Sequence, residues 1–110
     1  MEKITQGSTN VFADLGFPDA AERQAKLKLA MAINDIVAKR KLTQVQAANL
    51  LEINQPKISA LANYKLEGFS VERLMNFLTA LDRDVEIIIR KPKKHHRGSR
   101  GRGEIRVAAA

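Results

Sequence analysis

The spacing of apolar residues predicts a long first helix in this chain. Its buried stripe recurs at intervals of three and four residues: Leu29, Ile33, Ile36 and Val37. Asp19 followed by Glu22 has the spacing of a capping box, so we expect the helix to begin after Pro18 with Asp19 as its N-cap. The helical pattern continues to about Lys41.

Two shorter helices joined by a tight turn are predicted between residues 44 and 63. Their apolar positions are those that a crossed helix pair buries: Ala48, Leu51, Ile53, Ile58 and Leu61. Thr43 and Gln46 have capping-box spacing, Asn54 precedes the next helix as its cap, and Pro56 falls in the first turn of that helix. The second helix leaves a hydrogen-bonding and cationic set outside: Gln55, Pro56, Lys57 and Ser59.

A fourth helix and a strand are predicted beyond the next loop. Ser70 is placed to cap the helix. Its apolar residues again have helical spacing: Val71, Leu74, Phe77, Leu78 and Leu81. Residues 84–90 are rich in β-branched side chains and predict a strand. A lone strand leaves its backbone groups unpaired, so a second copy is the expected partner, and the alternative is an extended segment packed on the helices. The dimerisation residues would be Val85, Ile87 and Ile89.

These elements define an all-α fold, a small helical bundle of about four to five helices, with a C-terminal β-strand that pairs across a dimer. A chain of 110 residues is the size of one domain. We divide it into an N-terminal arm (1–18), a helix-turn-helix domain (19–83), a dimerisation strand (84–90) and a basic disordered tail (91–110). Four apolar residues of the arm either fold back as a lid over the core or dock on another protein: Val11, Phe12, Leu15 and Phe17.

Composition excludes several other classes of protein. There is no cysteine, so disulfides and thiolate metal sites are impossible. His95 and His96 are adjacent, which is not a metal-ligand spacing, and the folded body has no histidine for a catalytic triad. The longest apolar run, residues 29–33, is far shorter than the roughly 20 residues of a membrane span. We therefore predict no catalysis, no metal or cofactor and no membrane association, in a cytoplasmic, prokaryotic protein.

The net charge of +7 is concentrated at the C-terminal end of the chain. Eight basic residues and one acid lie between Arg90 and Arg106, so residues 1–89 are neutral overall. Five tail cations accompany glycines: Lys93, Lys94, Arg97, Arg100 and Arg102. They either bind nucleic-acid phosphates without reading sequence or form a solvated segment. Within the neutral body, residues 39–65 hold five basic residues and one acid, which makes a basic patch at the paired helices.

The paired helices have the layout of a helix-turn-helix, whose second helix enters the DNA major groove. Gln55 can bond adenine N6 and N7, and the Pro56 ring can touch a thymine methyl group. The predicted base-reading residues are Gln55, Pro56, Lys57 and Ser59. The predicted phosphate-binding residues are Thr43, Gln44, Asn63 and Lys65. Alternatively, these are solvated polar residues on a small helical domain.

The segment from Gln44 to Asn63 resembles the helix-turn-helix of Cro- and phage-repressor-like proteins, the XRE family. In that family a glutamine that opens the second helix often braces one near the start of the recognition helix, and Gln44 and Gln55 stand at those places. Glu52 departs from the family, which usually has a glycine at this turn. Residues 10–90 are similar to a narrower group, the HigA-type antitoxins. The matching stretches are N-V-F-A-D-L-G-F-P-D (10–19), L-T-Q-V-Q-A-A (42–48), Q-P-K-I-S-A-L (55–61) and G-F-S-V-E-R-L (68–74).

The resemblance implies a repressor that binds a toxin. Members of the HigA-type group bind a RelE/HigB-like ribonuclease toxin encoded beside them and repress the shared promoter. We therefore expect a nucleoid-associated homodimer that binds a palindromic operator in double-stranded DNA, with half-sites about 10 bp apart. Two alternatives remain open. One is a free-standing XRE-type repressor without a toxin partner, and the other is a nucleic-acid-binding module led by the Arg/Gly tail.

Overall fold

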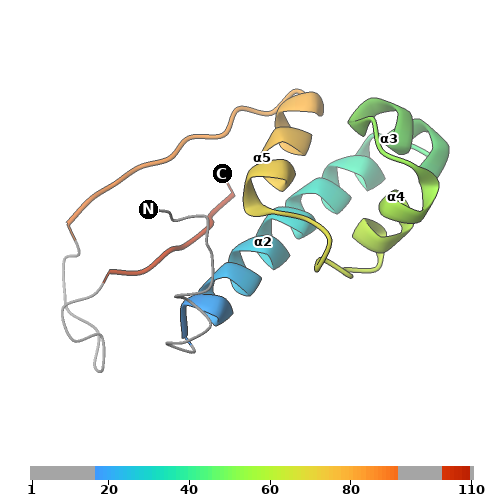
Figure 1. Cartoon of the computed structure of the whole chain (residues 1–110). Coiled ribbons are helices and arrows are strands. Elements are labelled where there is room, and N and C mark those ends of the chain that lie inside the picture. The colour runs from blue at the N-terminus through green and yellow to red at the C-terminus, as the bar shows by residue number, and fades with distance from the viewer. Residues whose placement is uncertain (1–16, 92–102, 110) are drawn as a thin grey trace.

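The computed structural model describes residues 17–91 and 103–109, with side chains from Ala20 onward. The described part contains four α-helices: α2 (Phe17–Lys39), α3 (Gln44–Leu51), α4 (Gln55–Ala62) and α5 (Val71–Ala80). In Figure 1, α2 forms the long axis, α5 lies beside it, and α3 and α4 gather at its C-terminal end. The predicted all-α architecture is therefore confirmed for the described residues.

One aliphatic core joins the four helices. Ile33 of α2, Leu61 of α4 and Leu74 of α5 are completely buried, as is Leu81 just beyond α5. Helix α2 packs against α4 and α5, and α3 packs against the same two helices. Burying one such side chain stabilises a fold by roughly 1.5–3 kcal/mol. Because Leu61 is among these residues, the position of α4 is set by the core.

The predicted N-caps of the three shorter helices are confirmed: Thr43 for α3, Asn54 for α4 and Ser70 for α5. The Thr43 hydroxyl accepts the Gln46 N–H at 3.1 Å, and the Thr43 N–H donates to Gln46 Oε1 at 2.8 Å. This is the complete capping box that the sequence predicts. Asn54 Oδ1 accepts the Lys57 N–H at 2.9 Å, which satisfies one exposed donor in the first turn of α4.

All four described helices end in the same type of turn. A non-glycine residue just beyond each helix has a left-handed backbone with φ between 56° and 69°: Lys41, Glu52, Tyr64 and Asp82. The residue after each turn then donates its N–H to a carbonyl five positions back, at 2.8–3.0 Å: Leu42 to Val37, Ile53 to Ala48, Lys65 to Ala60 and Arg83 to Leu78. These are Schellman bonds, which end a helix by satisfying its last carbonyls.

Both predicted ends of the first helix need correction. Helix α2 already includes Phe17 and Pro18, so Asp19 lies inside it and the prediction of Asp19 as N-cap is wrong. Proline is compatible with a first helical turn because its missing N–H has no intrahelical acceptor there. The helix ends at Lys39 instead of Lys41, because the left-handed backbone of Lys41 turns the chain away.

The strand predicted at residues 84–90 does not form within the described part of the chain. The structure gives residues 83–91 neither helix nor strand, and this segment leads away from the helices (orange in Figure 1). A strand needs a second backbone to bond with, and no described segment pairs with this one. Val85 is half-buried against the core, whereas Ile87, Ile88 and Ile89 are 75%, 64% and 93% exposed.

The C-terminal residues 103–109 have no regular structure but lie beside α2 (red in Figure 1). Val107 is half-buried and packs against the helical core. The sequence offered no assignment for this residue, because a single valine has no periodicity to reveal a buried face. Three of the four predicted lid residues, Val11, Phe12 and Leu15, lie outside the described residues, as do the five tail cations from Lys93 to Arg102. The fourth, Phe17, is the first residue of α2.

Candidate nucleic-acid interface

The first candidate contact surface is the N-terminal end of α3. Thr43 and Gln44 are both exposed there. The Thr43 hydroxyl uses an acceptor lone pair for the cap, so its own hydrogen stays available for donation. The N–H groups of Gln44 and Val45, the first two residues of the helix, have no intrahelical acceptor. Together these donors and the positive end of the helix dipole suit a phosphate group.

The second surface is the N-terminal end of α4. Gln55 and Pro56 are exposed, and Ser59 is half-buried. Gln55 and Ser59 are four residues apart and therefore share one face of the helix. Pro56 carries no N–H, and Asn54 accepts the Lys57 N–H, so the backbone of this turn is largely satisfied without a ligand. The exposed side chains are thus left to make contacts outside the protein.

A tight turn sets the angle between α3 and α4. Glu52 adopts φ 58° and ψ 45°, and Ile53 after it is half-buried against the core. A glutamate in place of the usual glycine could either be strained into the glycine conformation or change the shape of the turn. The structure shows the first outcome, so the usual geometry of the turn is kept in spite of the missing glycine.

The C-terminal end of α4 is tied to α2. Asn34 Nδ2 donates to the carbonyl oxygen of Leu61 at 3.1 Å, across 27 residues of sequence. Asn63 caps the same end through its own amide, which donates to the Ser59 carbonyl at 2.9 Å. Ile58 and Leu61 hold the inner face of the helix in the core. The helix that carries Gln55 is therefore held along its length by the rest of the domain.

Lys57 was predicted to contact DNA, but its side chain contacts other residues of the same domain. Its amino group donates to the Gly68 carbonyl at 3.2 Å and lies 5.0 Å from the centre of the Phe69 ring. The side chain thus reaches from the first turn of α4 to the loop before α5. Sequence reasoning missed these contacts because Gly68 and Phe69 are more than ten residues away in the chain.

Some cations of the basic patch have a partner among the described residues, and others do not. Lys39 pairs with Asp35 at 3.1 Å, and an Arg40 Nη donates to the Leu81 carbonyl at 3.4 Å. Lys41 and Lys65 are exposed and have no side-chain partner among the described residues. Lys65 was predicted to bind phosphate. Lys41 was not, although its place two residues before the cap of α3 could have suggested that role.

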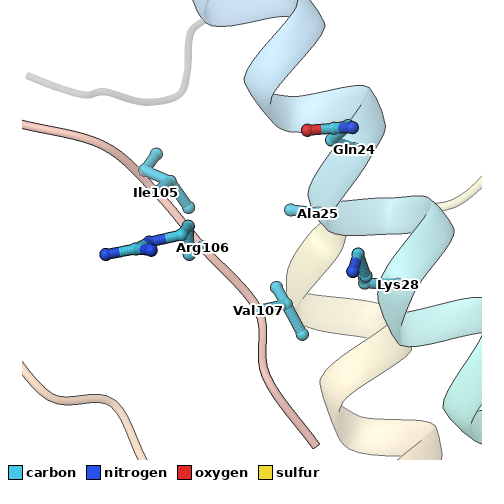
Figure 2. Close-up of a pocket in the computed structure, with 6 residues that line it drawn as sticks. All are labelled: Gln24, Ala25, Lys28, Ile105, Arg106 and Val107. Carbon is cyan, nitrogen blue, oxygen red and sulfur yellow. The ribbon is translucent and has the colours of Figure 1, made fainter. Parts of the chain in front are cut away.

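A shallow depression elsewhere on the surface does not belong to this interface. Its volume is about 190 Å³, and it lies between α2 and the C-terminal segment (Figure 2). The lining residues are Gln24, Ala25, Lys28, Ile105, Arg106 and Val107. They lie on the N-terminal half of α2 and on the C-terminal segment, whereas α3 and α4 are at the other end of α2.

The described residues show two further features that bear on function. They contain no group of three or more His, Cys, Asp or Glu side chains that could hold a metal ion. Within the same residues, no helix combines the length and the apolar character that a membrane span requires.

The geometry defines a class of protein. Two short helices meet at a left-handed turn, and the second is anchored in the core with a polar first turn exposed, which is a helix-turn-helix. Residues 11–90 match a family described as a helix-turn-helix domain. A solved structure named XRE family transcriptional regulator is 59% identical, with a TM-score of 0.76, and the match covers 84% of this chain and 100% of that one. No curated protein matches the chain. The chain belongs to the XRE family of helix-turn-helix regulators.

Proposed function

We propose that this protein is a DNA-binding transcriptional regulator that represses its own promoter as a homodimer. The observation that carries the proposal is the pair of exposed, capped helix ends at α3 and α4, backed by a buried hydrophobic anchor. Such a pair presents one helix end to a phosphate and the first turn of the other to base edges. The family membership supports the same class of function.

The proposed contacts are made by polar side chains at the ends and on the outer face of the paired helices. Thr43 and Gln44 would bind one phosphate, while Asn63 and Lys65 would bind another beyond the C-terminal end of α4. On the shared face of α4, Gln55 would read an adenine and Ser59 a neighbouring base, with the Pro56 ring against a thymine methyl group. Lys57 is left out of this set because its amino group already donates to the Gly68 carbonyl.

Pairing of residues 84–90 between two copies would cover two features that the single chain leaves exposed. Three consecutive isoleucines are exposed on the segment that follows α5, and their backbone has no strand partner among the described residues. Pairing with the same segment of a second copy would cover both the side chains and the backbone groups. It would also present two recognition helices to a palindromic operator, about 34 Å apart.

The antitoxin role is a narrower proposal that rests on the resemblance of residues 10–90 to HigA-type proteins. In that role the chain would bind a RelE/HigB-like toxin encoded by the neighbouring gene. The second candidate, a free-standing repressor, uses the same DNA-binding residues. Co-expression with the product of the adjoining reading frame separates the two, because only an antitoxin co-purifies with it.

Operator selection tests the DNA-binding proposal. The full chain would be used to select duplexes from a random library at near-physiological salt, and the recovered sites would be compared with the DNA upstream of its own gene. We expect an inverted repeat, and Gln55→Ala should lose about 1–3 kcal/mol of discrimination at one base pair of each half-site. Gln24→Ala, an exposed glutamine on the far half of α2, is the matched control and should leave the preference intact. Equal recovery of all duplexes would contradict the proposal.

A further inference from the structure

The side chain of Lys57 makes two contacts with the segment between α4 and α5. Its ammonium group lies 3.2 Å from the Gly68 carbonyl oxygen and 5.0 Å from the centre of the Phe69 ring. We call this set of contacts, formed by Lys57, Gly68 and Phe69, the Lys57 clasp. The clasp links the first turn of α4 to the loop that leads into α5.

The loop side of the clasp is rigidly held. Phe69 is only 2% exposed, and its ring meets Phe77 of α5 edge-on, with 5.9 Å between centroids and an angle of 77°. Arg73 of α5 lies 6.0 Å from the Phe69 ring and 5.6 Å from the Phe77 ring. The Phe69 ring is therefore packed against α5 and contacts two cations, Lys57 and Arg73. It gives the Lys57 ammonium group a buried partner whose position is set by α5.

The clasp has a counterpart at the other end of α4. There Asn34 of α2 donates to the Leu61 carbonyl. One polar side chain thus orients each end of the recognition helix, one from α2 and one towards α5. We propose that Lys57 is a positioning residue, which sets the angle of the first turn of α4 and makes no contact with DNA itself. The proposal rests on the DNA-binding function argued above.

Charge chemistry supports this assignment. A charge-assisted hydrogen bond and a cation–π contact both stabilise an ammonium group where it lies, so reaching for a phosphate would sacrifice both. Lys65, by contrast, is exposed and would sacrifice nothing. The two lysines lie in the same basic patch, so their substitutions can be compared directly.

Three variants separate a positioning lysine from a DNA-contacting one. Lys57→Met removes the charge but keeps an unbranched side chain, and Lys57→Arg keeps the charge and the donors. Gly68→Ala leaves Lys57 in the sequence but puts a methyl group 2.8 Å from its amino nitrogen, so the amino group must shift from its position in the clasp. Gly68 does not have the left-handed backbone that would disfavour alanine. Lys65→Met is the matched control for the removal of one charge.

The measurement is the affinity of each full-length variant for a selected operator duplex and for a scrambled duplex, over a series of salt concentrations. For Lys57→Met and Gly68→Ala we expect about a tenfold loss of operator affinity, a reduced preference over the scrambled duplex and an unchanged salt slope. Lys57→Arg should restore most of the affinity. Lys65→Met should instead lower the slope by about 1.8, which is the value for two phosphates, one per subunit of the dimer, that the protein no longer neutralises.

The opposite pattern overturns the proposal. If Lys57→Met lowers the salt slope while Gly68→Ala binds normally, Lys57 neutralises a phosphate and the clasp is incidental. Unchanged operator affinity in both variants also overturns it. If circular dichroism shows that Lys57→Met does not fold, Gly68→Ala still tests the proposal, because this variant keeps the charge of Lys57. Failure of the wild-type chain to select any sequence would count against the proposed function and not against the clasp.

Discussion

At the scale of single residues, the left-handed turns carry conformational strain at a functional junction. Glu52 has φ 58° between α3 and α4, in a conformation that costs a residue with a Cβ roughly 1–2 kcal/mol. The Schellman bond from the Ile53 N–H to the Ala48 carbonyl, at 3.0 Å, holds it there. The hydrophobic burial of Leu51 and Ile58 on either side outweighs this cost.

Glu52→Gly should therefore stabilise the protein. Glycine removes the strain but loses about 0.5–1 kcal/mol of backbone entropy, so we expect a net gain of about 0.5–1 kcal/mol in the free energy of unfolding. Chemical denaturation monitored by circular dichroism measures this gain. Glu72→Gly, an exposed position in the first turn of α5, is the control and should be destabilising. A loss of stability in Glu52→Gly would show that the glutamate makes a compensating contact.

At the scale of elements, the segment 84–90 is the one whose conformation the single chain leaves open. Its central residues are largely exposed, and such an apolar stretch is costly in water. Its side chains would alternate in direction in a strand, so Val85, Ile87 and Ile89 would share one face. Only Val85 of this segment packs against the helical core, so the three isoleucines are left for the pairing proposed above.

Ile87→Lys should break the proposed dimer. In a symmetric antiparallel pair centred on the segment, the two introduced lysines would stand opposite each other, and like charges at such positions are destabilising. We expect at least about a tenfold increase in the dimer dissociation constant, measured by sedimentation equilibrium. Glu86→Lys places a lysine on the opposite face and should dissociate less. A wild-type chain that is monomeric at all concentrations would rule out the pairing.

At the scale of the whole molecule, the net charge lies in a different part of the chain from the helices. Residues 1–89 are neutral, while the C-terminal part holds the net charge of +7. The ion pair of Lys39 with Asp35 in α2, at 3.1 Å, is at the surface and stabilises little. The cations of the tail would therefore add electrostatic attraction for DNA in the proposed function.

Neutralising the tail tests its role. Val107 packs on the core, so removing everything beyond Lys91 would disturb the body as well. The better variant keeps residues 103–110 and changes five cations to glutamine: Lys93, Lys94, Arg97, Arg100 and Arg102. We expect weaker binding to operator and scrambled duplexes alike, with the salt slope reduced by about 0.9 for each phosphate that the tail neutralises in the wild-type complex. An unchanged slope would leave the tail as a solvated segment.

Much of the fold was predictable because its signals are local. The cap at Thr43 is predicted by its spacing from Gln46, and the caps at Asn54 and Ser70 by their place just before a helical pattern. The buried stripe of α2 is predicted by intervals of three and four. The position of the turn after α3 was predicted, but whether Glu52 would adopt the left-handed conformation was left open by the sequence and is shown by the structure. The start of α2 was not predicted, because Asp19 and Glu22 match a capping box in any context, and the local pattern does not show where the chain enters the helix.

The sequence by itself determined the number and order of the described helices, the caps of the three shorter ones, their inward faces and the basic patch beside the paired helices. These follow from backbone geometry and side-chain period, which act over three to five residues. Only the tertiary structure decided which polar groups are free and which are engaged. Lys57 and Lys65 look alike in the sequence, but packing brings Gly68 and Phe69 to the first of them and leaves the second in solvent. That distinction depends on contacts between residues distant in the chain, which no local pattern records.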